Sequence, residues 1–167
     1  VMQCFHDAVR ANGARYKTWH AWAMVNADAV KLAAGAETKH AYLLAALEAL
    51  YHAIDVTSAG ETIQDVLTLL NLAFDHCTAR HVEETMVRCV DKLDVAVWLS
   101  VIPQIIARIS SRNPVLRRVA QAILCRVGRE HPQAVAYPLN VVAKTMSSDA
   151  AAAAQAVFAA IRPAAGA

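Results

Sequence analysis

The sequence predicts an all-α fold, an α-solenoid of about nine antiparallel helices with TPR-like or HEAT-like repeats. Of the 167 residues, 57% are hydrophobic and 18% are charged, which excludes an intrinsically disordered chain. Alanine, the strongest helix former, occupies 36 positions, whereas there are only 5 Gly and 5 Pro. Apolar residues recur at helical spacing, with interruptions that mark helix pairs of roughly 35 to 40 residues.

Of the first three expected helices, one ends near residue 13, the second runs from 16 to 34, and the third runs from 38 to 56. The first ends at Ala11-Asn12-Gly13, because glycine readily takes the left-handed conformation found after a helix, and the second stops near Gly35. The third presents one apolar stripe at the helical period. Its members are Leu43, Leu44, Leu47, Leu50, Tyr51 and Ile54.

The next two expected helices begin at residue 58 and at about residue 79. Ser58 and Glu61 have the spacing of a capping box, in which both side chains bond to free backbone amides. In the later helix, Glu84 and Arg88 are spaced for an exposed ion pair. The inward positions of the two helices are Ile63, Val66, Leu67, Leu70 and Phe74, then Val82, Met86, Cys89 and Leu93.

Two further helices are expected between residues 94 and 128. Asp94 caps the first, and Pro103 forces a kink or a fresh start because proline has no backbone amide donor. Asn113-Pro114 is a cap followed by proline at the first helical position, and Gly128 is expected to end that helix. Its apolar face comprises Leu116, Val119, Ala120, Ile123, Leu124 and Val127.

The last two expected helices run from 132 to 146 and from 148 to 163. Pro132 opens the first, and Pro138 is expected to bend it. Ser148 or Asp149 caps the second, which is rich in alanine.

Charge and cysteine content narrow the class of protein. A net charge of +2 from 16 basic and 14 acidic residues is too balanced to favour nucleic acid or an anionic membrane as partner. The four cysteines lack a Cys-x-x-Cys pair and are expected to be reduced thiols in the core of a cytosolic protein. We expect no membrane span, because charged or polar residues interrupt every long apolar run. The helical pattern already in progress at residue 4 suggests a segment of a larger protein.

Several side-chain groups could carry chemistry, but each has a simpler structural interpretation. His76, Cys77 and His81 lack the second closely spaced pair of a zinc site, so no metal is expected. Trp19 and Trp22 favour core packing over an aromatic ligand box. The carboxylates Asp28, Glu37, Glu48, Asp55 and Asp65 are expected on solvated faces. A solvated or salt-bridged face is also favoured over an anion site for Arg108, Arg112, Arg117, Arg118, Arg126 and Arg129.

Four strings of residues carry a family resemblance. They are YKTWHAWA at 16–23, QDVLTLL at 64–70, WLSVIPQIIARI at 98–109, and HPQA at 131–134 followed by YPL at 137–139. In these strings the chain resembles the C-terminal part of the FAT domain of the target-of-rapamycin (TOR) branch of the phosphatidylinositol-3-kinase-related protein kinases. It departs from that branch in the short connection at 33–39, where a long polar insert is common, and in the alanine-rich tail after Ser148.

The resemblance implies a non-catalytic scaffold segment of a serine/threonine protein kinase. Its expected partners are the kinase and rapamycin-binding domains of the same chain and other subunits of a TOR complex, in the cytoplasm or peripherally on endomembranes. ATP and Mg²⁺ would belong to the kinase domain, since the chain has no His-Arg-Asp, Asp-Phe-Gly or glycine-rich phosphate loop. TOR-type FAT domains also hold an inositol hexakisphosphate, to which Lys17 is the candidate contributor here.

The residues assigned structural roles are Trp19, Trp22, Trp98, Pro103, Arg108, His131, Pro132, Tyr137 and Pro138. Among them, Arg108 is flanked by apolar residues and is expected to pair inside the stack with a carboxylate or with helix-end carbonyls. His131 is expected to end a helix. Two alternatives stay open at this point: a free-standing TPR or HEAT adaptor that binds a peptide or protein, and a helical enzyme with a metal or acid-base centre.

Overall fold

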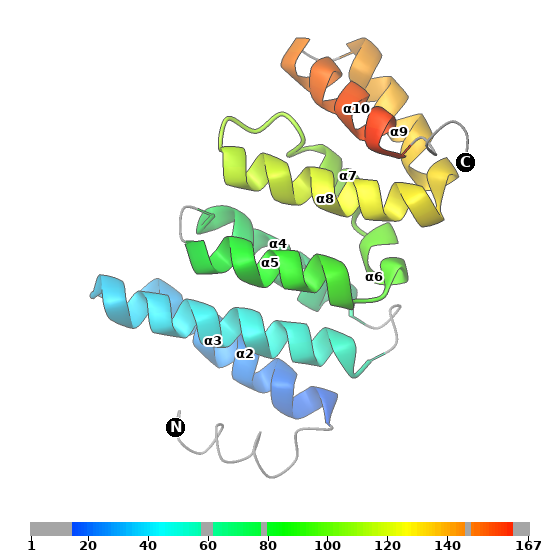
Figure 1. The fold of residues 1–167 in the computed structure, drawn as a ribbon. Helices are drawn as coiled ribbons and strands as arrows, with labels where there is room; N and C mark the ends of the chain where they lie inside the picture. Colours follow the sequence, from blue (N-terminus) through cyan, green and yellow to red (C-terminus); the bar gives the residue numbers. More distant parts are fainter. Residues whose placement is uncertain (1–14, 58–61, 78–79, 146–147, 162–167) are drawn as a thin grey trace. The chain divides into compact units, whose positions relative to one another are not determined.

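A computed structural model describes residues 15–57, 62–77, 80–145 and 148–161. Within these ranges all regular structure is helical and no strand occurs, so the predicted all-α class is confirmed (Figure 1). The expected N-terminal helix and the Ser58 to Glu61 capping box lie outside the described residues. The described helices are α2 (Tyr16–Leu32), α3 (Ala36–Asp55), α4 (Ile63–Asp75), α5 (Arg80–Lys92), α6 (Val95–Leu99), α7 (Ile102–Ile106), α8 (Pro114–Glu130), α9 (Pro132–Thr145) and α10 (Ser148–Ile161).

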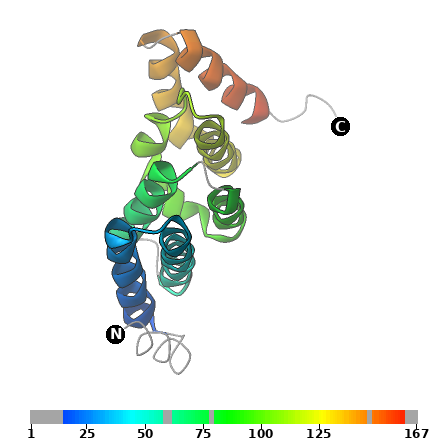
Figure 2. The same ribbon diagram turned by 90° about the vertical axis from the view of Figure 1, so that its left-hand side faces the viewer.

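The chain divides into two compact units, residues 1–97 and 98–167. In the first, a three-residue connection joins α2 to α3, and the two helices lie side by side in both ribbon views (Figures 1 and 2). α3 also packs against α4 and α5, which makes it the central helix of this unit. It therefore contributes many fully buried residues: Ala46, Leu47, Ala49, Leu50, Ala53 and Ile54.

The buried face of α4 differs from the predicted stripe. Val66 and Leu70 are buried as expected, but Ile63 is 41% exposed. Asp65 is buried instead, with a side chain only 1% exposed, so its predicted place on a solvated face is wrong. Most of the buried positions precede the predicted ones by one residue, so the face that α4 buries is turned by one position about the helix axis. The buried set is Thr62, Asp65, Val66, Leu69, Leu70 and Ala73.

The inward face of α5 is confirmed, but its predicted ion pair is wrong. The four expected inward residues, Val82, Met86, Cys89 and Leu93, are all buried. Arg88 pairs with Glu48 of α3, at 2.6 Å, rather than with Glu84 of its own helix. The packing of α3 on α5 supplies this partner, which spacing along one helix does not reveal.

Proline and asparagine set the helix starts as the sequence predicts. Asp94 Oδ1 accepts a hydrogen bond from the Ala96 amide at 2.8 Å, consistent with a cap for α6. Pro103 stands in the first turn of α7, so its effect is a fresh start after α6. Asn113 caps α8, because its Oδ1 accepts from the Val115 and Leu116 amides.

In the second unit, α8, α9 and α10 pack against one another, and the short α7 lies against α8 and α9. The predicted apolar face of α8 is confirmed, since all six of its members are buried. α9 begins at Pro132 and holds Pro138 in its interior. It is described as far as Thr145, and the expected last residue, Met146, lies outside the described residues; α10 follows from Ser148.

Gly128 does not end α8, which continues to Glu130. It is buried, and a Cβ atom at this position would lie 2.2 Å from Cδ1 of Ile161 on α10. Gly128 falls four residues after Leu124, on the buried face of the helix. Its role is thus to let α10 approach α8 closely, and the predicted helix stop is wrong.

Arg108 is exposed, so its predicted place inside the stack is also wrong. Ile105 and Ile109 are buried on either side of it, but α7 ends at Ile106, and Arg108 stands in the turn that follows the helix. Ala107, in the same turn, is exposed as well. Being flanked by buried residues along the sequence therefore did not bury the arginine.

Candidate functional site

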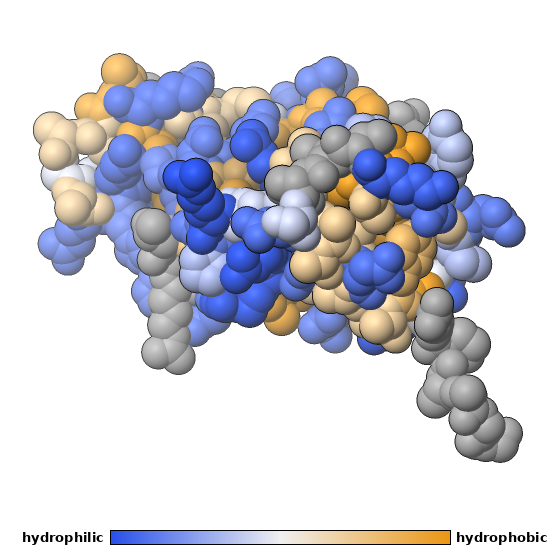
Figure 3. Space-filling view, turned by 90° about the horizontal axis from the view of Figure 1, so that it is seen from above, coloured by the Kyte–Doolittle hydropathy of each residue, from blue (hydrophilic) through white to orange (hydrophobic). Residues whose placement is uncertain are grey.

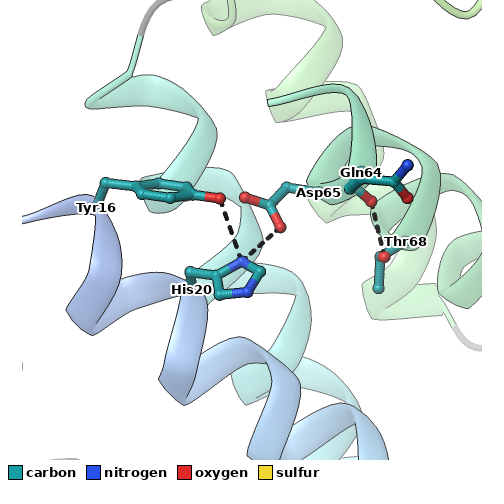
Figure 4. A network of polar contacts seen from close by, with 5 residues as sticks. All are labelled: Tyr16, His20, Gln64, Asp65 and Thr68. Carbon is teal, nitrogen blue, oxygen red and sulfur yellow. Dashed lines mark hydrogen bonds and ion pairs between the residues drawn. The ribbon is translucent and has the colours of Figure 1, made fainter. Parts of the chain in front are cut away.

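The most distinctive polar network in the first unit links α2 to α4 (Figure 4). His20 Nδ1 lies 2.7 Å from Asp65 Oδ1, and the Tyr16 hydroxyl lies 3.4 Å from the same nitrogen. The His20 side chain is 39% exposed, whereas that of Asp65 is 1% exposed. The second carboxylate oxygen of Asp65 is buried and has no hydrogen-bond partner among the described residues.

The geometry of this network indicates a structural tie between helices. A carboxylate can only accept hydrogen bonds, so His20 donates from Nδ1 and Asp65 fixes the orientation of the ring. Such a pair would need a nucleophile or substrate at Nε2 to act in catalysis. The nearby Thr68 hydroxyl instead donates to the Gln64 carbonyl of its own helix, at 2.8 Å. We therefore interpret the pair as holding α2 on α4.

A second group joins aromatic rings and an ion pair between α2, α3 and α5. Trp19 stacks on His52, with 4.4 Å between ring centroids and 25° between planes. His52 meets Tyr51 edge to face at 5.1 Å, and the Arg88 guanidinium lies 5.1 Å from the Tyr51 ring centroid. The hydrogen bond to Glu48 raises the pKa of Arg88, and burial raises the pKa of Tyr51. Trp19 is half-buried and packs on His52, and its place in the core stays a prediction.

The described cysteines, Cys77, Cys89 and Cys125, form no disulfide and are suited to packing. Burial raises the pKa of Cys89 from 9.0 to about 12, so its thiol stays protonated near neutral pH. Burial also raises the pKa of Cys125, and Cys77 is buried. A reactive cysteine needs a lowered pKa, so the environment of Cys89 is that of an inert core residue.

Metal binding finds no support within the described ranges. No group of three or more His, Cys, Asp or Glu side chains there is arranged to hold a metal ion. His81 lies against His40, with ring centroids 4.8 Å apart, and 3.7 Å from Glu84. No helix in the described part is long and apolar enough to cross a membrane.

The remaining predicted residues fall into buried and exposed sets. Trp98 is fully buried, in keeping with its predicted structural role, and Trp22 is half-buried. His131 ends α8, where its backbone amide donates to the Val127 carbonyl at 2.6 Å. Tyr137 is 77% exposed, so it is not a core residue. Lys17 is exposed in the first turn of α2.

The second unit carries a basic helix and an apolar groove. On α8, Arg117, Arg118 and Arg129 are exposed, while Arg126 is half-buried with Nη1 enclosed and unpaired among the described residues. A groove of about 570 Å³ opens beside the C-terminal end of this helix. Sequence reasoning missed the groove, because it depends on how three helices meet. Its lining includes Arg129, Pro132, Ala136, Phe158, Ala160 and Ile161.

Comparison with known proteins adds the family. Residues 81–165, half of the chain, match the family described as serine/threonine-protein kinase ATR-like, HEAT repeats. The chain belongs to this family. The HEAT match and the helical layers within each unit identify the all-α fold as an α-solenoid.

Relatives of this ATR-like HEAT-repeat chain are TOR kinases. The serine/threonine-protein kinase TOR of Oryza sativa is 35% identical over 138 residues, which cover 78% of this chain. TOR of Arabidopsis thaliana is 34% identical over 156 residues (90% of the chain), and mTor of Drosophila melanogaster is 29% identical over 170 residues (88%). The chain spans only about 6 to 7% of the length of these relatives.

Proposed function

We propose that this chain is a non-catalytic scaffold segment of a TOR-type serine/threonine protein kinase in growth and nutrient signalling. In this role it packs around the kinase domain of the same protein and supports assembly with other complex subunits. The observation that carries the proposal is the similarity to TOR kinases along most of the chain, in a region built of HEAT-type helices. This similarity favours a kinase segment over a free-standing adaptor.

The physical basis of the scaffold role is the packing within each unit. Residues such as Ile105 are fully buried, and a helical stack that buries such residues in each layer resists bending. A stiff stack can hold a neighbouring domain in a fixed position without taking part in the chemistry. The absence of kinase motifs from the sequence is consistent with this division of labour, in which the kinase domain binds ATP and Mg²⁺.

An alanine substitution in the full-length protein tests the proposal. Ile105→Ala should lower the stability of the segment by about 3 to 5 kcal/mol, because it leaves a cavity in the core. The neighbouring Gln104 is exposed, so Gln104→Ala is the matched control. We expect reduced kinase activity and weaker subunit association for Ile105→Ala alone. Full activity and association of a variant shown by thermal denaturation to be destabilised would contradict the scaffold role.

Inositol hexakisphosphate fits the described residues only in part. Lys17 and the exposed Arg15 are the basic residues at the start of α2, and the next one on this helix is Lys31, about 21 Å further along. Two cations do not balance six phosphates, so Lys17 is proposed only as a contributor to a site completed elsewhere in the protein. Unchanged binding of inositol hexakisphosphate by the full-length Lys17→Ala variant would remove it from that role.

A further inference from the structure

The connection between α7 and α8 carries a serine among basic residues. It comprises residues 107–113, whose backbone forms turns and irregular structure rather than a helix (Figure 1). Arg108 and Arg112 are exposed there, and Ser111 is half-buried. The stretch of chain from residue 95 to residue 129 contains six arginines and no Asp or Glu. A group with several negative charges would therefore meet arginines on this stretch without a competing carboxylate.

The place of this connection in a helical stack keeps it away from the packing faces. Neighbouring repeats of a solenoid cover the sides of the helices, whereas the turns between helices lie along the edges of the stack. Arginine, serine and asparagine, which make up most of the connection, are typical of such surface positions. Ile109 is buried and anchors the connection to the core. Further repeats on either side therefore leave Ser111 on an edge.

The hydrogen bonds of Ser111 are local. Its amide donates to the Arg108 carbonyl at 3.0 Å, and its Oγ accepts from the Asn113 amide at 3.2 Å. Both bonds join residues two or three positions apart and lie outside the helices. Extending this backbone thus breaks a turn and withdraws Ile109 from the core, but it unwinds no helix.

The sequence around Ser111 has the charge pattern of a protein kinase substrate. Arg108 stands three positions before Ser111, and arginine-directed serine/threonine kinases recognise this spacing with carboxylates beside their active site. Such kinases bind the substrate as an extended segment, which places the hydroxyl against ATP. Arg15 and Thr18 have the same spacing, but Thr18 lies inside α2 and would require that helix to unwind.

The serine on the side of α9 and α10 lacks this pattern. Figure 3 faces this side and shows apolar residues gathered there. Ser148 is exposed at the start of α10, but Asp149 follows it directly. The residue three positions before it is Thr145 rather than an arginine. Of these hydroxyls, Ser111 is the one that combines the arginine with backbone outside a helix.

We propose that Ser111 is a phosphorylation site for a separate, arginine-directed serine/threonine kinase. Ser111 Oγ attacks the γ-phosphorus of ATP, the bond from this phosphorus to the oxygen that bridges to the β-phosphate breaks, and ADP leaves. The hydroxyl proton passes to the catalytic aspartate of that kinase. The new phosphate brings a charge of about −1.5 to −2 next to Arg112, which reverses the local charge of the connection. The proposal is independent of the scaffold role proposed above.

The test incubates the full-length protein with ATP and calcium/calmodulin-dependent protein kinase II, a kinase directed by arginine at this spacing. A synthetic peptide with the sequence of residues 104–115 is the reference substrate, because it carries the pattern without the fold. Mass spectrometry should find phosphate on Ser111 of both, at a lower rate in the protein because Ile109 must leave the core. A reaction without the added kinase is subtracted. Absence of phosphate from Ser111 of the protein would overturn the proposal, whether or not the peptide is modified.

Matched variants assign the acceptor and the recognition. Ser111→Ala should abolish the added phosphate, and Arg108→Gln should lower the initial rate at least about tenfold, as expected for loss of a close charge pair. Arg117→Gln makes the same charge change on α8 outside the pattern and should change the rate less than about twofold. Thr18→Ala should leave the rate unchanged. Circular dichroism checks that each variant keeps its helices.

Two results with these variants would overturn the proposal. Equal losses in Arg108→Gln and Arg117→Gln would show that net charge alone attracts the kinase. Undiminished phosphate in Ser111→Ala would place the acceptor elsewhere, at Ser110 or Thr18.

Discussion

Replacing His20 with alanine would leave the Asp65 carboxylate without its only described partner. The hydrogen bond to His20 is 2.7 Å long, and the Asp65 side chain is 1% exposed. Stranding a buried charged group costs more than the 1 to 3 kcal/mol typical of a neutral one, up to about 5 kcal/mol. His20 is 39% exposed, so water can replace part of the lost bond. We therefore expect His20→Ala to lower the free energy of unfolding by about 2 to 3 kcal/mol.

A second substitution separates the cost of the stranded charge from the loss of the imidazole. Asp65→Asn keeps the size of the side chain but removes its charge, and a neutral amide is less costly to bury. The double variant His20→Ala/Asp65→Asn should therefore recover about 1 kcal/mol relative to His20→Ala. His81→Ala is the control, because this histidine is 53% exposed and its contacts, with Glu84 at 3.7 Å and with the His40 ring, involve no buried carboxylate. It should cost less than about 0.5 kcal/mol.

Urea denaturation followed by far-UV circular dichroism measures these differences. The dependence of unfolding free energy on urea concentration should stay the same among the variants, so that midpoint shifts report stability. A loss below about 0.5 kcal/mol for His20→Ala would refute the reasoning, since the pair would then be no stronger than a surface contact. A double variant less stable than His20→Ala would show that the stranded charge is not the source of the cost.

Three further predictions concern single contacts. Gly128→Ala should destabilise by about 1 to 3 kcal/mol in thermal denaturation, because the new Cβ would clash with Ile161, and an added Ile161→Ala should restore part of the loss. The half-exposed pair of Glu48 and Arg88 should show a coupling energy of about 0.5 to 1 kcal/mol in a double-mutant cycle, reduced in 1 M salt; an unchanged coupling would contradict screening. Cys89 should resist a thiol reagent near pH 9 until urea is added, and rapid labelling of the native protein would contradict this. Its raised pKa keeps the folded thiol protonated while the unfolded thiol ionises, so the free energy of unfolding should fall as the pH rises from 9 toward 12.

Local signals predicted the helices well where the chemistry was self-contained. The Asn113 side chain accepts hydrogen bonds from the free amides of the first turn of α8, and Pro114 fits its first position. Both effects are local, so the start of the helix could be predicted to the residue. Pro103 acts in the same way, since its missing amide interrupts any helix. The fold class followed because helical spacing of apolar residues extends over most of the chain.

The errors arose where a neighbouring helix decides the outcome. Glycine is a residue type that often ends helices, but the close approach of Ile161 from α10 gives Gly128 another role. Aspartate is a residue type usually found in solvent, but the hydrogen bond from His20 of α2 offsets part of the cost of burying Asp65. Both residues stand on the buried side of their helices, so strict use of the helical period could have identified them. The partners themselves are set by tertiary packing.

The central claim is that this chain is a helical-repeat scaffold that supports a kinase domain elsewhere in the same protein. A cryo-electron microscopy map of the full-length protein tests it most directly. The account predicts helices α2 to α10 at the positions given above, with at least one unit in contact with the kinase domain. A map in which these helices are formed but lie free of the kinase domain and of every other subunit would contradict it.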